Sequence, residues 1–138
     1  TTEEPLLVVN GDVLTRVDFG KMLEFHSEHQ AEMTVGVREH ETQIPFGVVE
    51  IKDVEITQIT EKPVLRNFIN AGVYLLSPEV RNRIPSNIAY DMTDVIADLI
   101  SSGRKVVSFP INEYWKDIGQ LADYKQAQDD AESGNLPK

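Results

Sequence analysis

The sequence predicts an α/β fold in which helices flank a mixed sheet, and three observations support this class. Residues 5–10 are apolar rather than alternating, which is typical of a strand covered on both faces. Residues 91–102 carry apolar side chains at the spacing of one helical face. Strand-like and helix-like segments also follow one another in mixed order, and we expect about six or seven strands and three to four helices.

The N-terminal third of the chain predicts strand, helix and strand. Gly11-Asp12 ends the strand at residues 5–10. Asp18 can then cap a helix whose apolar positions follow the three–four spacing of one helical face. Residues 33–37 alternate between apolar and polar or small side chains, which predicts a half-buried strand.

The middle of the chain predicts a hairpin and a further strand. Residues 46–51 and 55–60 favour two short strands around a turn at Lys52-Asp53. Residues 68–76 favour a strand that is interrupted at Asn70-Ala71-Gly72. Ser77 followed by Pro78 is typical of a helix start.

The C-terminal third predicts two helices around a short strand. Asp91 caps the helix at 91–102 and Gly103 ends it. Residues 106–109 favour a strand, and residues 115–119 lead into a last helix. The final residues, 133–138, are expected to be a frayed tail.

Length, charge and composition narrow the function classes. The 138 residues predict a single domain spanning 1–138. A net charge of −10 argues against nucleic-acid polymers and anionic membranes as partners. The longest apolar run is far shorter than the roughly 20 residues of a membrane span. Without cysteine there is no thiolate metal site or disulfide. We therefore expect a soluble, cytoplasmic protein.

Asn10-Gly11-Asp12 is the first group that could carry chemistry. It follows an apolar strand, so the carboxylate of Asp12 would lie at the carboxyl edge of the sheet, where α/β proteins bind ligands. A carboxylate there suits Mg²⁺, which prefers one or two protein oxygens with phosphates and waters. The alternative is that Gly-Asp is simply a turn.

Glu61-Lys62-Pro63 is the second group. Proline biases Lys62 toward an extended conformation, which would point Glu61 and Lys62 to opposite sides of the chain. Glu61 could then accept hydrogen bonds from hydroxyls while Lys62 contacts a phosphate. The alternative is a solvated loop.

Three further patterns have both a functional and a structural interpretation. Gly47 and Gly72 lie in strand-like segments, where a glycine marks either a bulge or the close approach of a ligand. The amide of Asn70 could bond a hydroxylated ligand there, or it could bond locally at a bulge. Asp117 lies two residues after the sole tryptophan, Trp115. Either Asp117 binds a ligand, or Trp115 is a core residue and Asp117 caps the last helix. The histidines lack the partners of a metal set, and no P-loop or Gly-x-Gly-x-x-Gly motif occurs.

Taken together in their order, these motifs resemble those of the sugar-phosphate nucleotidyltransferases, in particular the mannose-1-phosphate guanylyltransferase-like branch. The resemblance covers roughly residues 5–130 and rests on five segments: 6–12, 44–50, 59–63, 69–74 and 114–119 with Asp123-Tyr124 behind them. It implies the fold of the nucleotide-diphospho-sugar transferases, a GT-A or Rossmann-like mixed sheet flanked by helices.

The resemblance also implies roles for individual residues. Asp12 and Asp117 would be the two carboxylates that bind Mg²⁺. Lys62 would contact the phosphate of a sugar 1-phosphate, and Glu61 the sugar hydroxyls. The Gly47 backbone and Asn70 would complete the sugar pocket. The implied reaction is Mg²⁺-dependent transfer of a nucleotidyl group from an NTP to a sugar 1-phosphate, with release of pyrophosphate.

One family feature is absent from the sequence. The glycine-rich loop of the type Gly-Gly-x-Gly-Thr-Arg-Leu does not occur, and the chain begins Thr1-Thr2 without an initiator methionine. We therefore expect the C-terminal part of a larger domain that lacks the N-terminal nucleotide-binding strands. Such a chain would make no NDP-sugar alone. It would also expose an unpaired strand edge and self-associate as a homo-oligomer.

Two other functions remain open on the sequence. One is a non-catalytic module that binds a sugar phosphate or regulates a partner on the same fold. The other is a metal-dependent glycosyltransferase. The second is disfavoured because such enzymes usually carry an Asp-x-Asp pair, whereas the second position after Asp12 is Leu14.

Overall fold

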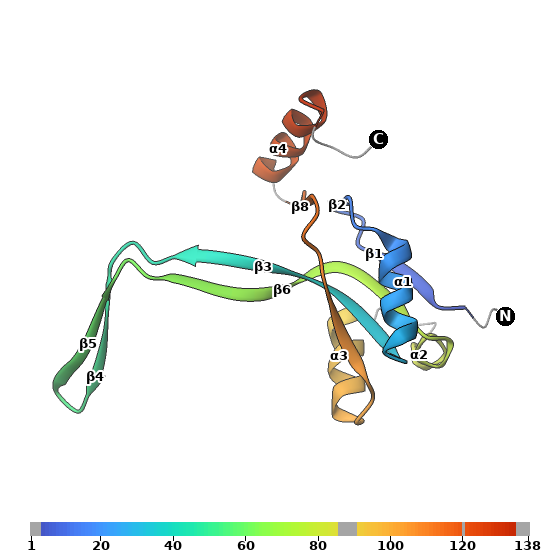
Figure 1. Ribbon diagram of the computed structural model, residues 1–138, viewed down its shortest axis with the longest axis horizontal. Helices are drawn as coiled ribbons and strands as arrows, with labels where there is room; N and C mark the ends of the chain where they lie inside the picture. The colour runs from blue at the N-terminus through green and yellow to red at the C-terminus, as the bar shows by residue number, and fades with distance from the viewer. Residues whose placement is uncertain (1–3, 86–90, 120, 135–138) are drawn as a thin grey trace. The chain divides into compact units, whose positions relative to one another are not determined.

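The computed structural model describes residues 4–85, 91–119 and 121–134, and confirms a mixed α/β protein (Figure 1). Two compact units divide the chain: the first unit comprises residues 1–37 and 70–138, and the second unit residues 38–69. The elements in chain order are β1 (Leu6–Val9), β2 (Val13–Thr15), α1 (Phe19–Glu28), β3 (Met33–Gln43), β4 (Gly47–Lys52), β5 (Glu55–Glu61), β6 (Val64–Leu76), α2 (Pro78–Arg83), α3 (Met92–Ser101), β7 (Val106–Pro110), β8 (Trp115–Asp117) and α4 (Leu121–Glu132).

The main sheet has the strand order β1-β6-β3-β7. Its β1–β6 pair is antiparallel, with Leu6 opposite Leu76. Its β3–β7 pair is parallel, with Met33 opposite Val106. The predicted mixed sheet is therefore confirmed.

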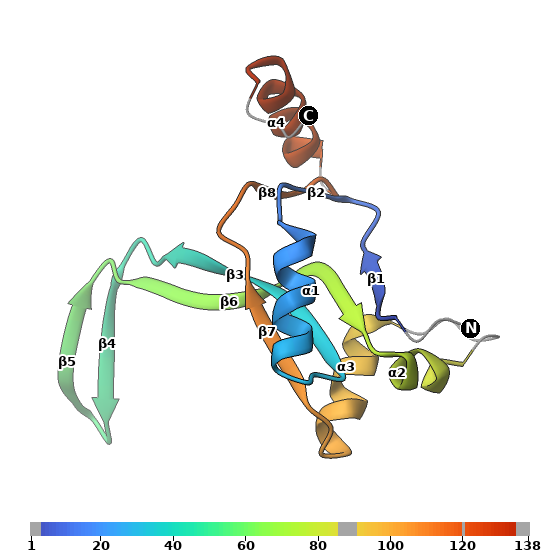
Figure 2. The same ribbon diagram turned by 45° about the vertical axis from the view of Figure 1, so that its right-hand side comes forward.

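Helices cover both faces of this sheet in the first unit. Alternate side chains of β6 enter two different hydrophobic clusters, because successive residues of a strand point to opposite faces. The cluster with α2 and α3 contains Met33, Val35, Tyr74, Leu76, Val80, Val95 and Leu99. The cluster with α1 contains Val17, Met22, Ala71, Val73, Leu75 and Ile111. Both α1 and α3 contact β7, and both helices can be followed in Figure 2.

The first helix forms as its sequence predicts. The Asp18 side chain accepts a hydrogen bond from the Lys21 backbone N–H at 3.1 Å, which satisfies one of the free donors at the helix start. Met22 and His26, one helical turn apart, are the buried residues of α1. The apolar stripe thus faces the sheet.

Three predictions about strands need correction. β1 is not covered on both faces, because it lies at the edge of the main sheet and Leu6, Leu7 and Val9 are exposed. The strand starting at Met33 is not half-buried there, because Met33, Thr34, Val35 and Gly36 are all buried under helices on both faces. The strand predicted from Phe68 starts earlier, at Val64, and runs to Leu76 without a break. Gly72 instead takes a left-handed φ of +74° inside this strand.

A short ladder absent from the sequence prediction joins distant parts of the chain. β2 pairs antiparallel with β8, with Val13 opposite Asp117 and Thr15 opposite Trp115 (Figure 1). This ladder carries the loop that contains Asp12. Of the predicted frayed tail, residues 135–138 lie outside the described residues, as do residues 1–3.

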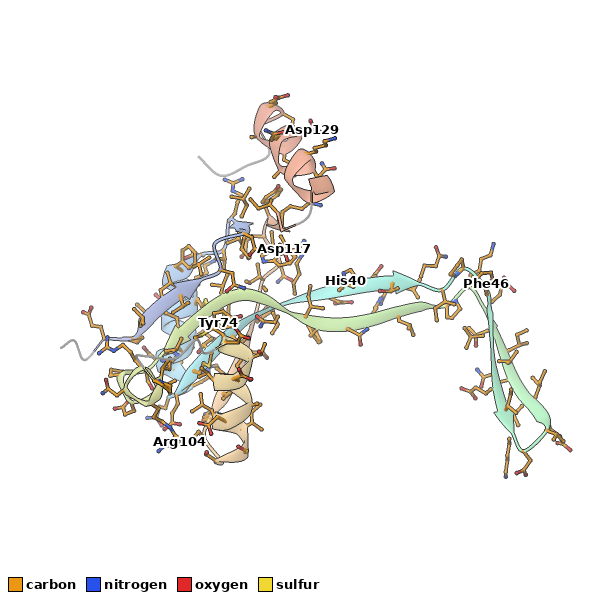
Figure 3. All side chains as sticks on the ribbon, turned by 180° about the vertical axis from the view of Figure 1, so that it is seen from behind. His40, Phe46, Tyr74, Arg104, Asp117 and Asp129 are labelled. Carbon is orange, nitrogen blue, oxygen red and sulfur yellow. The ribbon has the colours of Figure 1, made fainter. Side chains whose placement is uncertain are left out.

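The second unit contains the predicted hairpin. β4 and β5 pair antiparallel with Val49 opposite Ile59, and the connection lies at Asp53 and Val54. Most of its large apolar side chains are exposed, including Phe46, which Figure 3 labels. Among the residues that the structure describes, none of the helices has the length and apolar character of a membrane span.

Candidate functional site

The β2–β8 ladder brings Asp12 and Asp117 together. The Ile118 backbone N–H donates a hydrogen bond to the Asp12 carbonyl at 2.7 Å, which extends the ladder by one residue. Oδ2 of Asp12 and Oδ1 of Asp117 each lie 3.0 Å from the position that a Cβ atom of Gly119 would take. The two carboxylate oxygens are therefore no farther apart than twice that distance.

Both aspartates are exposed, so their carboxylates are open to a ligand. Asp117 lies on β8 and is labelled in Figure 3. Its Oδ1 accepts a hydrogen bond from the Gly119 backbone N–H at 2.8 Å, which fixes the direction of the carboxylate. Two converging oxygen ligands with open space beside them suit a hard divalent cation such as Mg²⁺.

The middle of β6 supports both loops of this site. Gly72 accepts a hydrogen bond from the Asn10 backbone N–H at 2.8 Å. A Cβ atom at Gly72 would lie 2.8 Å from Nδ2 of Asn10, so a side chain would collide with this loop. The Trp115 indole N–H donates to the Ala71 carbonyl at 2.7 Å. Trp115 is partly buried against the α1 cluster, so its role as a core residue is confirmed.

A cavity of about 330 Å³ lies in the first unit, at the start of α3. Its lining residues are Asn10, Asn70, Tyr74, Asp91, Met92 and Thr93. Asn70 is held in place from both ends of its amide. Its Nδ2 donates to the Tyr74 hydroxyl at 2.9 Å, and its Oδ1 accepts from the Gly72 backbone N–H at 2.9 Å.

The remaining predicted residues lie in the second unit. Gly47 pairs with Glu61 across the hairpin, and Oε2 of Glu61 lies 3.5 Å from the position of a Gly47 Cβ atom. Lys62 follows directly and is exposed. Its predicted extended conformation is wrong, because Lys62 has a left-handed φ of +43°. Its backbone N–H donates to the Phe46 carbonyl at 3.2 Å, which requires the chain to turn at this point.

The shifted pKa values belong to groups away from the aspartate pair. Burial raises the pKa of Tyr114 to about 12, helped by its 2.5 Å hydrogen bond to Asp130. The same bond lowers the pKa of the Asp130 carboxyl, with a further contribution from Gln126. Burial also lowers the pKa of His26, whose Nδ1 lies 2.6 Å from the Thr34 hydroxyl. These contacts join elements of the first unit.

The histidines form no metal set, and within the described ranges there is no group of three or more metal-ligating side chains. His26 belongs to the core and His40 is exposed. A cation at Asp12 and Asp117 would therefore take its other ligands from water and substrate. Mg²⁺ is usually bound in this way, through one or two carboxylates and phosphate oxygens.

Several cavity residues were not found from the sequence. Asp91 was predicted only as a helix cap, but its side chain makes no capping hydrogen bond in the structure. Its carboxylate is therefore free for another role. Nothing in the local sequence marks Tyr74, Met92 or Thr93 as cavity residues, because they line the cavity only through the packing of α3 beside β6. Asn10 belongs to the first motif of the sequence, and the structure shows that it also lines this cavity.

Comparison with known proteins agrees with the resemblance of the motifs. The sequence profile of the nucleotidyl transferase family matches residues 1–134. A "Probable mannose-1-phosphate guanylyltransferase 2" of Oryza sativa subsp. japonica is 34% identical over 128 residues, which cover 88% of this chain and 34% of the relative. A glucose-1-phosphate adenylyltransferase of Bacillus licheniformis is 33% identical over 139 residues, covering 92% of this chain and 37% of the relative.

Solved structures show the same fold. A crystal structure from Bacillus anthracis, assigned as a glucose-1-phosphate thymidylyltransferase, superposes with a TM-score of 0.66 at 20% identity. The match covers 99% of this chain and 58% of that chain. The chain thus spans about a third of the length of the curated relatives and somewhat more than half of the solved one.

Proposed function

Because the chain belongs to the nucleotidyl transferase family, we propose that its complete gene product transfers a nucleotidyl group from an NTP to a sugar 1-phosphate. The single observation that carries the proposal is the convergence of Asp12 and Asp117 beside Gly119. These two carboxylates lie in separate motifs of the sequence and meet only through the β2–β8 ladder. The names of the relatives, which are sugar-1-phosphate guanylyl- and adenylyltransferases, support the same reaction class.

The aspartate pair fits a magnesium ion in its donor chemistry. Both donors are hard carboxylate oxygens, both are exposed, and the glycine between them leaves the intervening space free of side-chain atoms. Asp12 and Asp117 would hold the ion. When bound, the ion would neutralise phosphate charge at the reacting centre, a contribution worth several kcal/mol in such sites.

The reaction asks little covalent chemistry of the protein. An oxygen of the sugar phosphate attacks the α-phosphate of the NTP, the new P–O bond forms, and the bond to pyrophosphate breaks. The attacking oxygen is already anionic, so no general base is needed. The protein contributes positioning and charge neutralisation. Asp12 and Asp117 would hold the ion that supplies part of this charge neutralisation.

The cavity at the start of α3 suits a sugar. Its volume of about 330 Å³ falls within the roughly 300–1,000 Å³ of small-molecule sites. Asn70 offers an amide whose orientation is fixed by Tyr74 and Gly72, so little entropy is lost when it binds a hydroxyl. The free carboxylate of Asp91 adds a strong acceptor for a hydroxyl proton.

The residues of the second unit are considered by themselves, and for them we propose the roles that the motifs imply. Glu61, paired with Gly47 across the hairpin, would accept hydrogen bonds from sugar hydroxyls. Gly47 would allow the sugar to approach the backbone, since it carries no side chain. Lys62 would contact the phosphate as an exposed positive charge.

The test is pyrophosphate release by the complete gene product with an NTP and a sugar 1-phosphate in the presence of Mg²⁺. We expect Asp12→Asn and Asp117→Asn each to lower kcat/KM by about a hundredfold or more, because each removes a charged ligand. Asp129→Asn is the matched control, since Asp129 is an exposed carboxylate on α4. Near-normal turnover in the Asp117→Asn variant, or no pyrophosphate release from the natural protein with any sugar 1-phosphate, would overturn the proposal.

A further inference from the structure

We infer that Gly119 is a positioning residue that keeps the space between Asp12 and Asp117 open and orients Asp117; this inference rests on the proposed function. A Cβ atom at residue 119 would lie 3.0 Å from Oδ1 of Asp117 and 3.0 Å from Oδ2 of Asp12. The point that a side chain would occupy is therefore the point on which the two carboxylates converge. The Gly119 backbone N–H also donates to Oδ1 of Asp117 at 2.8 Å.

The backbone conformation does not explain why residue 119 is glycine. The glycines with left-handed φ values are Gly72, Gly103 and Gly134, and Gly119 is not among them. An alanine could adopt the backbone of residue 119 without the strain that a left-handed conformation imposes. Glycine at position 119 is therefore explained by the space that it leaves beside the two carboxylates, and its backbone conformation does not require it.

Gly11 provides a direct comparison within the same site. It precedes Asp12 in the sequence, and its φ is also not left-handed. Apart from its chain neighbours Asn10 and Asp12, a Cβ atom there would meet no atom within 4 Å. Adding a methyl group at Gly11 would therefore bring no contact with Asp117. A methyl group at Gly119 would instead lie 3.0 Å from a carboxylate oxygen of each aspartate.

The added methyl group would change the site more than the fold. A contact of 3.0 Å is shorter than the roughly 3.5 Å at which non-bonded atoms prefer to lie. The atoms in contact are the ends of two exposed side chains, which can rotate into solvent. The ladder itself is held by backbone hydrogen bonds and would persist. The rotated carboxylates would no longer converge on a common ligand.

The experiment is a titration of the 138-residue chain with Mn²⁺ alone, followed by electron paramagnetic resonance of the free ion. The natural chain is compared with the Gly119→Ala, Gly11→Ala and Asp117→Asn variants. We expect Gly119→Ala to weaken Mn²⁺ binding by about tenfold or more, the size found when groups that orient metal ligands are removed. Gly11→Ala should bind as the natural chain does. Circular dichroism and the Tm of Gly119→Ala should match those of the natural chain.

The outcomes separate this inference from the proposed function. If Asp117→Asn loses Mn²⁺ binding while Gly119→Ala keeps full affinity, the role of Gly119 is wrong and the metal site stands. A Tm of Gly119→Ala well below that of Gly11→Ala would also overturn the inference, because Gly119 would then support the fold. If the natural chain binds no Mn²⁺, or Asp117→Asn binds it equally well, the metal assignment of the proposed function fails and the inference fails with it.

Discussion

The Ile118 backbone N–H donates to the Asp12 carbonyl at 2.7 Å, so the main chain itself fixes the approach of the two aspartate-bearing segments. Because backbone atoms hold the two segments together, neither carboxylate is needed for a hydrogen bond between them. The carboxylates of Asp12 and Asp117 stay available to a ligand. A pair held in this way is preorganised for binding, since little of its geometry must be created when the ligand arrives.

Gly72→Ala should destabilise the first unit at the support of the Asn10 loop. The substitution combines a left-handed φ of +74° with a Cβ position 2.8 Å from Nδ2 of Asn10 and 3.0 Å from Val13. We expect the free energy of unfolding to fall by about 1–3 kcal/mol, the usual cost of such backbone strain. Urea denaturation measures it. Gly11→Ala is the control and should unfold as the natural chain does; equal stability of the two variants would refute the prediction.

The buried His26 should make the fold sensitive to mild acid. Burial lowers its pKa in the folded state below the 6.5 of an exposed histidine. The unfolded chain therefore binds a proton first as the pH falls through about 6.5, and the folded state loses stability there. The stabilisation is fully present above that pH. We expect the Tm to drop between pH 7 and pH 5.5 more steeply in the natural chain than in His26→Gln.

The control for this pH effect is His40→Gln, because His40 is an exposed residue of the second unit. Its Tm should follow the pH dependence of the natural chain. Equal slopes for the natural chain and His26→Gln would mean that the buried imidazole does not cause the acid sensitivity.

The Tyr114 hydroxyl should lose its proton only at high pH, and its hydrogen bond to Asp130 of α4 should be lost with that proton. Its pKa is raised to about 12, above the ordinary 10.0, mainly by burial and then by the bond to Asp130. The unfolded chain thus releases this proton first, so the contribution of Tyr114 to stability is complete below pH 10 and is lost as the pH rises to about 12. Ultraviolet absorbance follows the tyrosinate. Tyr114→Phe should remove a titration step near pH 12; removal of a step near pH 10 instead would contradict the assignment.

Strong local patterns were enough to predict most of the elements. The apolar run that includes Leu6–Val9 and the cap at Asp18 both led to elements that the structure contains. β2 was missed because three residues, Val13–Thr15, carry no periodicity and gain their partner β8 only from the far end of the chain. The burial of Thr34 was missed for a similar reason, since it depends on α1, whose His26 contacts the Thr34 hydroxyl.

The candidate site was predictable only through the order of its motifs. Asp12 by itself looks like a turn residue, and nothing local links it to Asp117. Asp91 was assigned to helix capping because its position before α3 matches that role, although its side chain makes no such bond. Cavity residues such as Thr93 become visible only once α3 is placed beside β6. The single domain, the cytoplasmic location and the homo-oligomer stay predictions.

An NMR titration of the 138-residue chain with substoichiometric Mn²⁺ tests whether Asp12 and Asp117 bind one cation together. If Asp12 and Asp117 form one cation site, paramagnetic broadening will first remove the amide signals of Asp12, Ile118 and Gly119. The acidic end of α4, which contains Asp129 and Glu132, will keep its signals. Broadening that begins on α4, or that spreads evenly over all acidic segments, would contradict the account.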